Sequence, residues 1–178
     1  MIKKMQGQTR FGDIQSALSH FNYLSQAMID TSSLIYLQEI DLLSLTGQWI
    51  KLWTIPGVIR EFGDGAKESP VYLIDVKNTA GTPADTDQML CLAADKLRLP
   101  IISEDRQILM RARNANLPYF NALMVLNFLL YKNALDLLEY QIVMDNLRGT
   151  ARYSEEIYEF GGRVLAEILR IQPSVLDK

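Results

Sequence analysis

The sequence predicts an α/β fold in which helices cover both faces of a mostly parallel sheet. Short apolar runs with β-branched or aromatic residues, such as 27–29 and 71–76, are typical of buried strands. The longer segments between such runs keep their apolar residues at helical spacing. Strands that alternate with helices pair in parallel through right-handed crossovers, which place helices on both faces of the sheet.

The first elements are expected to be a helix and a buried strand. Residues 13–24 have an amphipathic pattern after Asp13, a residue type that often caps helices. The apolar run 27–29 predicts a short strand, and Asp30 follows it directly. The next helix can be capped by any of three small polar residues, which are Thr31, Ser32 and Ser33.

Helical segments are predicted from this point to residue 65. Helical spacing continues over 34–45, and the apolar residues of 49–53 indicate one further turn. Pro56 suits the first position of a short helix, because the N–H that proline lacks has no partner there. Gly63 and Gly65 are expected to end that helix.

The middle of the chain repeats the alternation of strand and helix. Residues 71–76 have the composition of a strand, and Thr82 with Pro83 begins a helix. The pair 101–102 forms the centre of a short buried strand, and another helix starts near Asp105.

A last short strand is expected at 117–120, and the chain after Asn121 is predicted to form three helices. The clearest covers 154–170, where apolar residues repeat along one face. The longest apolar stretch, 122–131, contains Asn127 and is too short to cross a bilayer. We therefore expect no membrane contact.

Composition indicates a globular cytoplasmic protein. Apolar residues make up 48% of the 178 residues, so the chain can bury a sizeable core. The one cysteine, Cys91, fits a reducing compartment, and no apolar segment of a signal peptide follows the first lysines. The net charge is −3 and becomes +1 when Asp30, Glu61, Asp87 and Asp105 are set aside. Charge alone therefore neither supports nor excludes nucleic-acid binding.

These four acidic residues lie where apolar segments begin or end. A carboxylate beside an apolar run is normally solvated or paired, because its desolvation is costly. Asp30 and Asp105 each follow a strand, and ligands of open α/β sheets bind at the carboxyl ends of the strands. If these strands are neighbours, about 4.8 Å apart, the two side chains come close together. Asp87 and Glu61 can lean over the same edge.

Clustered carboxylates repel one another, and a divalent cation removes that repulsion. Ligation by oxygen alone, without His or Cys, suits Mg²⁺ or Mn²⁺ rather than Zn²⁺. Such a cation lowers the pKa of a bound water and holds a scissile phosphate. The pattern therefore indicates phosphodiester hydrolysis with one or two metal ions.

Each acid also has a structural interpretation. Asp30 and Asp105 can cap the helices that follow them, and Glu61 can be a solvated helix residue. Asp85 has the spacing of a first-turn acid after a cap at Thr82. Asp87 is thus the preferred ligand, and Asp85 is the alternative.

Other residue types add little to this site. Four arginines flank the acidic segments and can contact the phosphates of a substrate or lie on solvated helix faces: Arg60, Arg106, Arg111 and Arg113. Trp49 and Trp53 can stack on bases, but they fit core or interface packing better. His20 is the only histidine, which excludes a hydrolase built on a histidine pair, and there is no glycine-rich phosphate loop.

Four ordered segments resemble a known family: IDTSSLIYL, IPGVIREF, DTDQMLCLAADKLRLP and IISEDRQILMRA. With an acid after the first strand and a Ser, any residue, Asp pattern after a later strand, the chain resembles the PIN-domain family of metal-dependent nucleases over about residues 27–131. The resemblance implies a three-layer fold with a five-stranded parallel sheet. It also implies endo-hydrolysis of RNA with Mg²⁺ or Mn²⁺.

The same resemblance assigns site residues and domain boundaries. The implied acidic quartet is Asp30, Glu61, Asp87 and Asp105, and the small polar residues that bind ligands or water are Ser32 and Ser103. The expected organisation is an N-terminal helical extension at 1–26, a PIN-like core at 27–131, and C-terminal helices of the same domain at 132–178.

The resemblance also implies partners, and other functions can be compared with it. The family includes VapC-type toxins that pair with an antitoxin, and many members dimerise, so RNA, an antitoxin protein and a second copy of the chain are the expected partners. The alternative is a catalytically inactive module that binds RNA or a protein. Haloacid-dehalogenase-type enzymes are disfavoured because Ser32 stands where they need Asp. Receiver domains are disfavoured because 1–29 contains only Asp13 as an acid.

Overall fold

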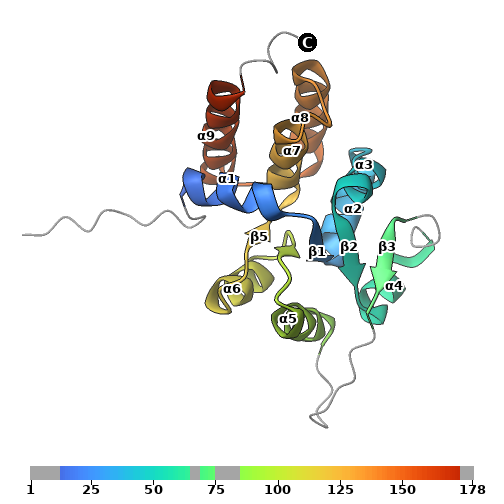
Figure 1. Ribbon diagram of the computed structural model, residues 1–178. Helices are drawn as coiled ribbons and strands as arrows, with labels where there is room; N and C mark the ends of the chain where they lie inside the picture. The colour runs from blue at the N-terminus through green and yellow to red at the C-terminus, as the bar shows by residue number, and fades with distance from the viewer. Residues whose placement is uncertain (1–12, 65–68, 75–84, 173–178) are drawn as a thin grey trace, which may run out of the picture.

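The computed structural model describes residues 13–64, 69–74 and 85–172, and its fold is the α/β class that the sequence predicts. Five parallel strands form one sheet in the order β3-β2-β1-β4-β5 (Figure 1). They are β1 (Gln26–Ile29), β2 (Lys51–Thr54), β3 (Val71–Leu73), β4 (Ile101–Ile102) and β5 (Tyr119–Phe120). Every pair of neighbours in this sheet is parallel, as expected for strands joined through helices.

The pairing of β1 with β4 determines where a ligand can bind. Met28 lies opposite Ile101, and Ile29 lies opposite Ile102. From β1 the sheet continues to β2 and β3 on one side, whereas from β4 it continues to β5 on the other. The carboxyl ends of β1 and β4 therefore flank the point where the strand order reverses, which is where open α/β sheets bind ligands.

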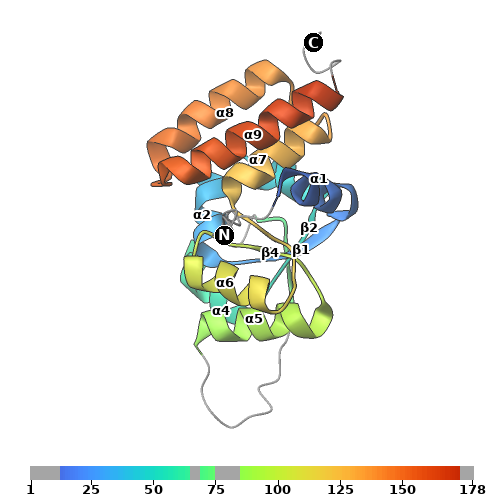
Figure 2. The same ribbon diagram turned by 90° about the vertical axis from the view of Figure 1, so that its left-hand side faces the viewer.

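Helices cover both faces of the sheet (Figure 2). They are α1 (Ile14–Tyr23), α2 (Thr31–Glu39), α3 (Leu43–Trp49), α4 (Pro56–Phe62), α5 (Thr86–Leu97), α6 (Arg106–Asn114), α7 (Ala122–Tyr131), α8 (Leu137–Thr150) and α9 (Glu155–Ile171). On one face α5 packs against α6, and on the other α7 contacts α2, α3, α8 and α9. No helix in the described ranges is long and apolar enough to span a bilayer.

The helix α7 is enclosed by its neighbours, and every residue from 122 to 130 is buried. Its one polar residue, Asn127, donates through Nδ2 to the Gly161 carbonyl of α9 at 3.1 Å and accepts the Tyr140 hydroxyl of α8 at 2.9 Å. Gly161 allows α9 to approach this closely, because a Cβ there would lie 2.6 Å from Leu123 Cδ2. The residue that interrupts the apolar run thus joins three helices.

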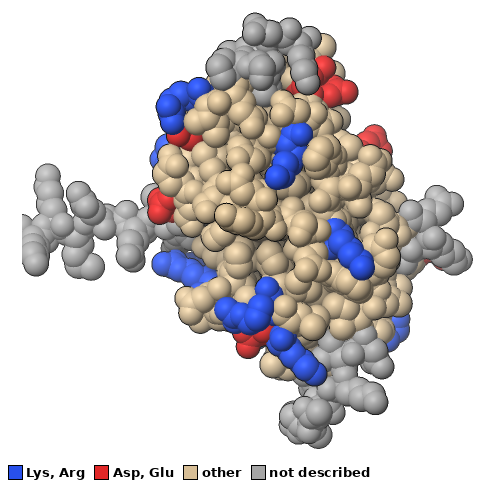
Figure 3. Space-filling model, viewed as in Figure 1, with Lys and Arg blue, Asp and Glu red and all other residues tan. Residues whose placement is uncertain are grey.

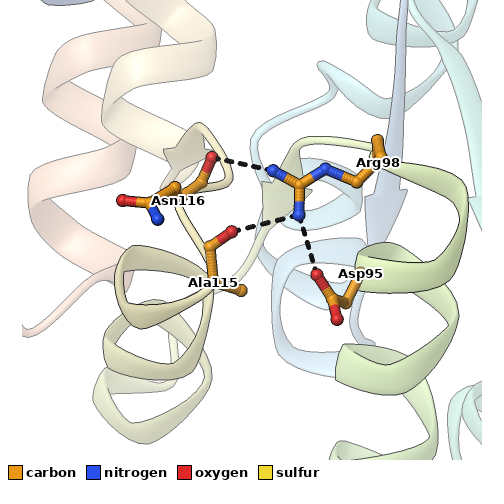
Figure 4. A network of polar contacts seen from close by, with 4 residues as sticks. All are labelled: Asp95, Arg98, Ala115 and Asn116. Carbon is orange, nitrogen blue, oxygen red and sulfur yellow. Dashed lines mark hydrogen bonds and ion pairs between the residues drawn. The ribbon is translucent and has the colours of Figure 1, made fainter.

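A second polar network connects the ends of α5 and α6 (Figure 4). Arg98, whose φ is +53°, ends α5 and donates to the Asp95 carboxylate at 2.8 Å. Its guanidinium also donates to the carbonyls of Ala115 at 3.1 Å and Asn116 at 3.5 Å. These contacts lie before β4, at the amino edge of the sheet, so they hold the α5–α6 layer from the side opposite the acidic residues.

Most predicted elements are confirmed within the described residues, but three local predictions are wrong. Residues 51–54 form β2 instead of a helical turn, because pairing with both β1 and β3 prevails over the apolar spacing. The helical segment 34–45 is divided by a turn at Asp41, whose φ is +57°. The third is the expected cap of α2 at Thr31, Ser32 or Ser33. The cap is Asp30, as the structural interpretation of that acid allowed.

One predicted helix start lies partly outside the described residues. Thr82 and Pro83 belong to that part of the chain, and α5 begins at Thr86 with Asp85 as its cap. Asp85 is therefore the cap itself, three residues after the Thr82 cap that the sequence pattern indicated, and not an acid of the first turn.

We expect Asn127→Leu to lower the free energy of unfolding by about 2–4 kcal/mol, because two buried groups lose their hydrogen-bond partner. These groups are the Tyr140 hydroxyl and the Gly161 carbonyl. Urea unfolding of Asn127→Leu, Tyr140→Phe and the double variant measures the effect. The double variant should lose less than the sum of the single losses, since both changes break the same hydrogen bond. Additive losses would contradict the network.

Candidate metal centre

Asp30 lies at the carboxyl end of β1 with only 3% of its surface exposed. Its Oδ1 accepts the Ser33 N–H at 2.8 Å and so caps α2. Its Oδ2 accepts the hydroxyls of Ser32 at 2.8 Å and Ser103 at 2.5 Å. Burial raises the pKa of Asp30, and these hydrogen bonds offset part of that rise. The side chain that caps α2 therefore also lies at the point where the strand order of the sheet reverses.

Asp105 follows β4 and caps α6. Its Oδ1 accepts the N–H groups of Gln107 at 2.6 Å and Ile108 at 3.1 Å. Ser103 accepts the Asp105 N–H at 3.0 Å while it donates to Asp30. One serine therefore links the two acids that follow the neighbouring strands. The second oxygen of Asp105 accepts no hydrogen bond from the described residues, so it is available to a ligand.

Glu61 reaches the same region from α4. The Thr31 hydroxyl donates to Glu61 Oε2 at 2.7 Å, and α4 contacts α2. Because Thr31 follows Asp30 directly, this hydrogen bond holds Glu61 beside the start of α2. Thr31 was expected only as a cap, and its contact with an acid of another helix has no local signal in the sequence.

Asp85 and Asp87 have different environments at the start of α5. Asp85 caps the helix, since its carboxylate accepts the backbone N–H of Gln88 at 2.7 Å and the side-chain amide of the same residue at 3.2 Å. Asp87 lies in the first turn and makes no hydrogen bond within the described part of the chain. Burial raises the pKa of Asp87, and four neighbouring carboxylates raise it further. These neighbours, in order of effect, are Asp105, Asp85, Asp30 and Glu61.

The charge at this edge suits a divalent cation, although the side chains do not form a complete ligand set. Carboxylate oxygens are preferred ligands of Mg²⁺ and Mn²⁺. No ion pair among the described residues involves Asp30, Glu61, Asp87 or Asp105. In the same ranges, no three His, Cys, Asp or Glu side chains lie close enough together to hold one ion. Cation binding would therefore require Asp87 and Asp105 to approach Asp30.

Glu104 is a further acid at this edge that sequence reasoning missed. Its carboxylate accepts the Ala122 N–H at 2.7 Å, the Ser33 hydroxyl at 3.4 Å and the Tyr153 hydroxyl. Burial raises the pKa of Glu104 to about 7, against an ordinary value of 4.5. Its position before Asp105 was the only signal available, because Tyr153 comes from the distant connection between α8 and α9.

The arginines near the acidic segments do not share one environment. Arg60 is exposed on α4, whereas Arg111 lies beside the thiol of Cys91. Arg106 and Arg113 line a cavity next to α6 that also reaches Glu104. Arg111 lines a second cavity, between α5 and α6, so Arg106 and Arg113 are the two that share a concave surface with Glu104.

The aromatic candidates lie away from the acids, with Trp53 packed within the fold and Trp49 exposed at the end of α3. Trp53 lies in β2, donates through Nε1 to Gln26 at 3.2 Å and packs against Tyr72. Lys51 Nζ lies 4.2 Å from the centre of the Trp53 ring. His20 lies edge-on to Phe120, and burial lowers its pKa. None of these contacts involves one of the four acids.

No family model, curated protein or solved structure matches this chain. The sheet is the five-stranded parallel sheet that the PIN resemblance implies, but this architecture does not by itself identify a family. Function must therefore be argued from the residues at the sheet edge.

We expect Glu104 to destabilise the protein increasingly as the pH rises from about 4.5 to about 7. Its pKa is higher in the folded state, so the folded state binds more protons over this range and unfolding becomes easier as the pH rises. The full effect is roughly 3 kcal/mol. Glu104→Gln, which keeps the side-chain shape without the charge, should gain stability relative to the wild type over this range in EDTA.

Thermal unfolding at several pH values measures this difference. Glu155→Gln, at an exposed position in the first turn of α9, is the control and should keep the pH dependence of the wild type. Parallel pH profiles for the wild type and Glu104→Gln would contradict the raised pKa.

Proposed function

We propose that this chain is a PIN-type endoribonuclease that hydrolyses RNA phosphodiester bonds with Mg²⁺ or Mn²⁺ at the carboxyl edge of its sheet. The supporting observation is that Asp30, Glu61 and Asp105 lie close enough to Asp87 to raise its pKa, at the carboxyl ends of β1 and β4 where the strand order reverses. Burial and, after it, the neighbouring carboxylates raise the pKa of Asp87, and a divalent cation would remove the repulsion among the carboxylates.

The acids contribute to cation binding in different ways. Asp30 is an anchored ligand, because hydrogen bonds to both of its oxygens fix its position. Asp105 offers one carboxylate oxygen that accepts no hydrogen bond from the described residues. Asp87 makes no hydrogen bond within the described part of the chain, so its side chain is the least constrained of the ligands. Glu61 completes the negative charge at the edge. A bound cation supplies a lowered pKa for water and stabilises the charge on the phosphate, so no histidine is needed as a base.

The ordered motifs add support of a different kind. An acid after β1, an acid on α4, an acid at the start of α5 and a Ser, any residue, Asp pattern after β4 follow the PIN order. From the same resemblance we propose RNA as the substrate, an antitoxin protein and a second copy of the chain as partners, and the cytoplasm as the location.

A non-catalytic module that binds RNA or a protein is the second candidate. One observation favours it: no three potential ligands in the described ranges are close enough for one ion, and Asp30 and Asp105 both serve as helix caps. In that case the acids would stabilise helix starts and the domain would bind without turnover.

Cleavage of labelled single-stranded and structured RNAs with Mg²⁺ or Mn²⁺ distinguishes the two functions. We expect EDTA-sensitive cleavage that Asp87→Asn reduces at least about 100-fold, because it removes a direct ligand. Asp85→Asn is the matched control: asparagine also caps helices well, so this variant should keep most of the activity.

Three outcomes would contradict parts of the proposal. Cleavage that survives Asp87→Asn and Asp30→Asn would place the activity elsewhere. Loss of cleavage in Asp85→Asn but not in Asp87→Asn would exchange the roles of these two acids. RNA binding without cleavage in either metal would favour the non-catalytic module.

A further inference from the structure

A cavity of about 430 Å³ lies between α6 and the connection from α8 to α9. One wall is a single face of α6, because Arg106, Leu109, Met110 and Arg113 repeat at helical spacing. Arg152, Tyr153 and the first turn of α9 form the opposite wall, and Tyr119 and Asn121 complete the lining. The volume is within the range of small-ligand sites, about 300–1,000 Å³.

The cavity combines three guanidinium groups with apolar and aromatic surface. Arg106, Arg113 and Arg152 are exposed and form no ion pair with any described carboxylate. Figure 3 shows Lys and Arg side chains over α6 and α5 at its lower left, so positive charge on these two helices is not limited to the cavity. Met110 is 53% exposed and adds apolar surface to the α6 wall of the cavity.

The cavity adjoins the candidate metal centre. Glu104, which lines it, is the residue before Asp105, and Arg106 is the residue after. The Ser33 hydroxyl contacts Glu104, while the Ser33 N–H contacts Asp30. The acidic edge and the cavity therefore meet at the connection between β4 and α6, so a polymer that crosses the edge can extend into the cavity.

We propose that this cavity binds one nucleotide of single-stranded RNA next to the scissile bond, with its phosphates on the arginines and its base on the apolar wall. The inference rests on the proposed function for its substrate class and adds a subsite formed by the C-terminal helices. Guanidinium groups bind phosphate in bidentate geometry, and flat apolar or aromatic surfaces accept bases of any sequence.

An acidic peptide is the competing occupant, because it would also satisfy three arginines. The mixed lining favours the nucleotide: Leu109, Met110 and Ile157 offer apolar surface that a run of carboxylates would leave unused.

The test measures binding of a fluorescent single-stranded RNA octamer by anisotropy in EDTA, where metal-dependent cleavage does not interfere. Arg113→Ala with Arg152→Ala should weaken binding at least about tenfold. It should also reduce the slope of log affinity against log salt concentration by about 1.4, because two phosphate contacts are lost. Both arginines are exposed, so the variant should fold, and thermal unfolding checks this.

Arg170→Ala is the control for the loss of a guanidinium group outside the cavity. It removes one positive charge, against two in the test variant, at a position about 21 Å along α9 from Glu156. It should keep both the affinity and the salt slope of the wild type. An equal loss in Arg170→Ala, no effect of the double change, or no RNA binding by the wild type would each overturn the inference. A glutamate-rich octapeptide that displaces the RNA with equal affinity would also overturn it, in favour of an acidic peptide.

The two proposals can fail separately. RNA binding that depends on Arg113 and Arg152, in a protein without nuclease activity, would retain the cavity and reject catalysis. Metal-dependent cleavage that is lost in Asp87→Asn, with RNA binding unchanged by the two arginine substitutions, would retain catalysis and reject the cavity.

Discussion

The parallel pairing of β1 with β4 is the constraint on which the rest of the candidate site depends. It places the ends of two strands from distant parts of the sequence side by side, and the chain leaves them in opposite directions. Asp30 and Asp105 then begin helices at this point, so their carboxylates face a common edge. Ser103 bonds to both residues and couples the two helix starts. Capping and clustering of charge are therefore consequences of one topology.

The C-terminal helices belong to this arrangement and are not a separate addition to it. Asn127 fixes α8 and α9 against α7, and the connection between those helices carries Tyr153 to Glu104. Glu104 in turn accepts the first N–H of α7. The start of α9 and the connection before it form one wall of a cavity beside the carboxyl edge of the sheet. The arginines of this cavity carry the opposite charge to the acids at the edge.

The fold class was predictable because hydrophobic periodicity is a local property of the sequence. That Asp30 and Asp105 follow neighbouring strands was only a condition at the level of the sequence, and the pairing of β1 with β4 meets it. The strand β2 was missed because its conformation depends on two pairing partners and the spacing of its apolar residues also fits a helix. Glu104 was missed because its partners come from α2, α7 and the connection between α8 and α9, and contacts of this kind leave no pattern in a single segment.

The most direct test of the account locates the cation itself. Crystals of the protein soaked in Mn²⁺ should give an anomalous difference peak at the carboxyl ends of β1 and β4, within about 2.0–2.6 Å of carboxylate oxygens of Asp30, Asp87 and Asp105. Such a peak would show that the acids move together around a cation. A peak elsewhere, or none at Mn²⁺ concentrations that saturate binding in solution, would contradict the central claim that this edge is a metal centre.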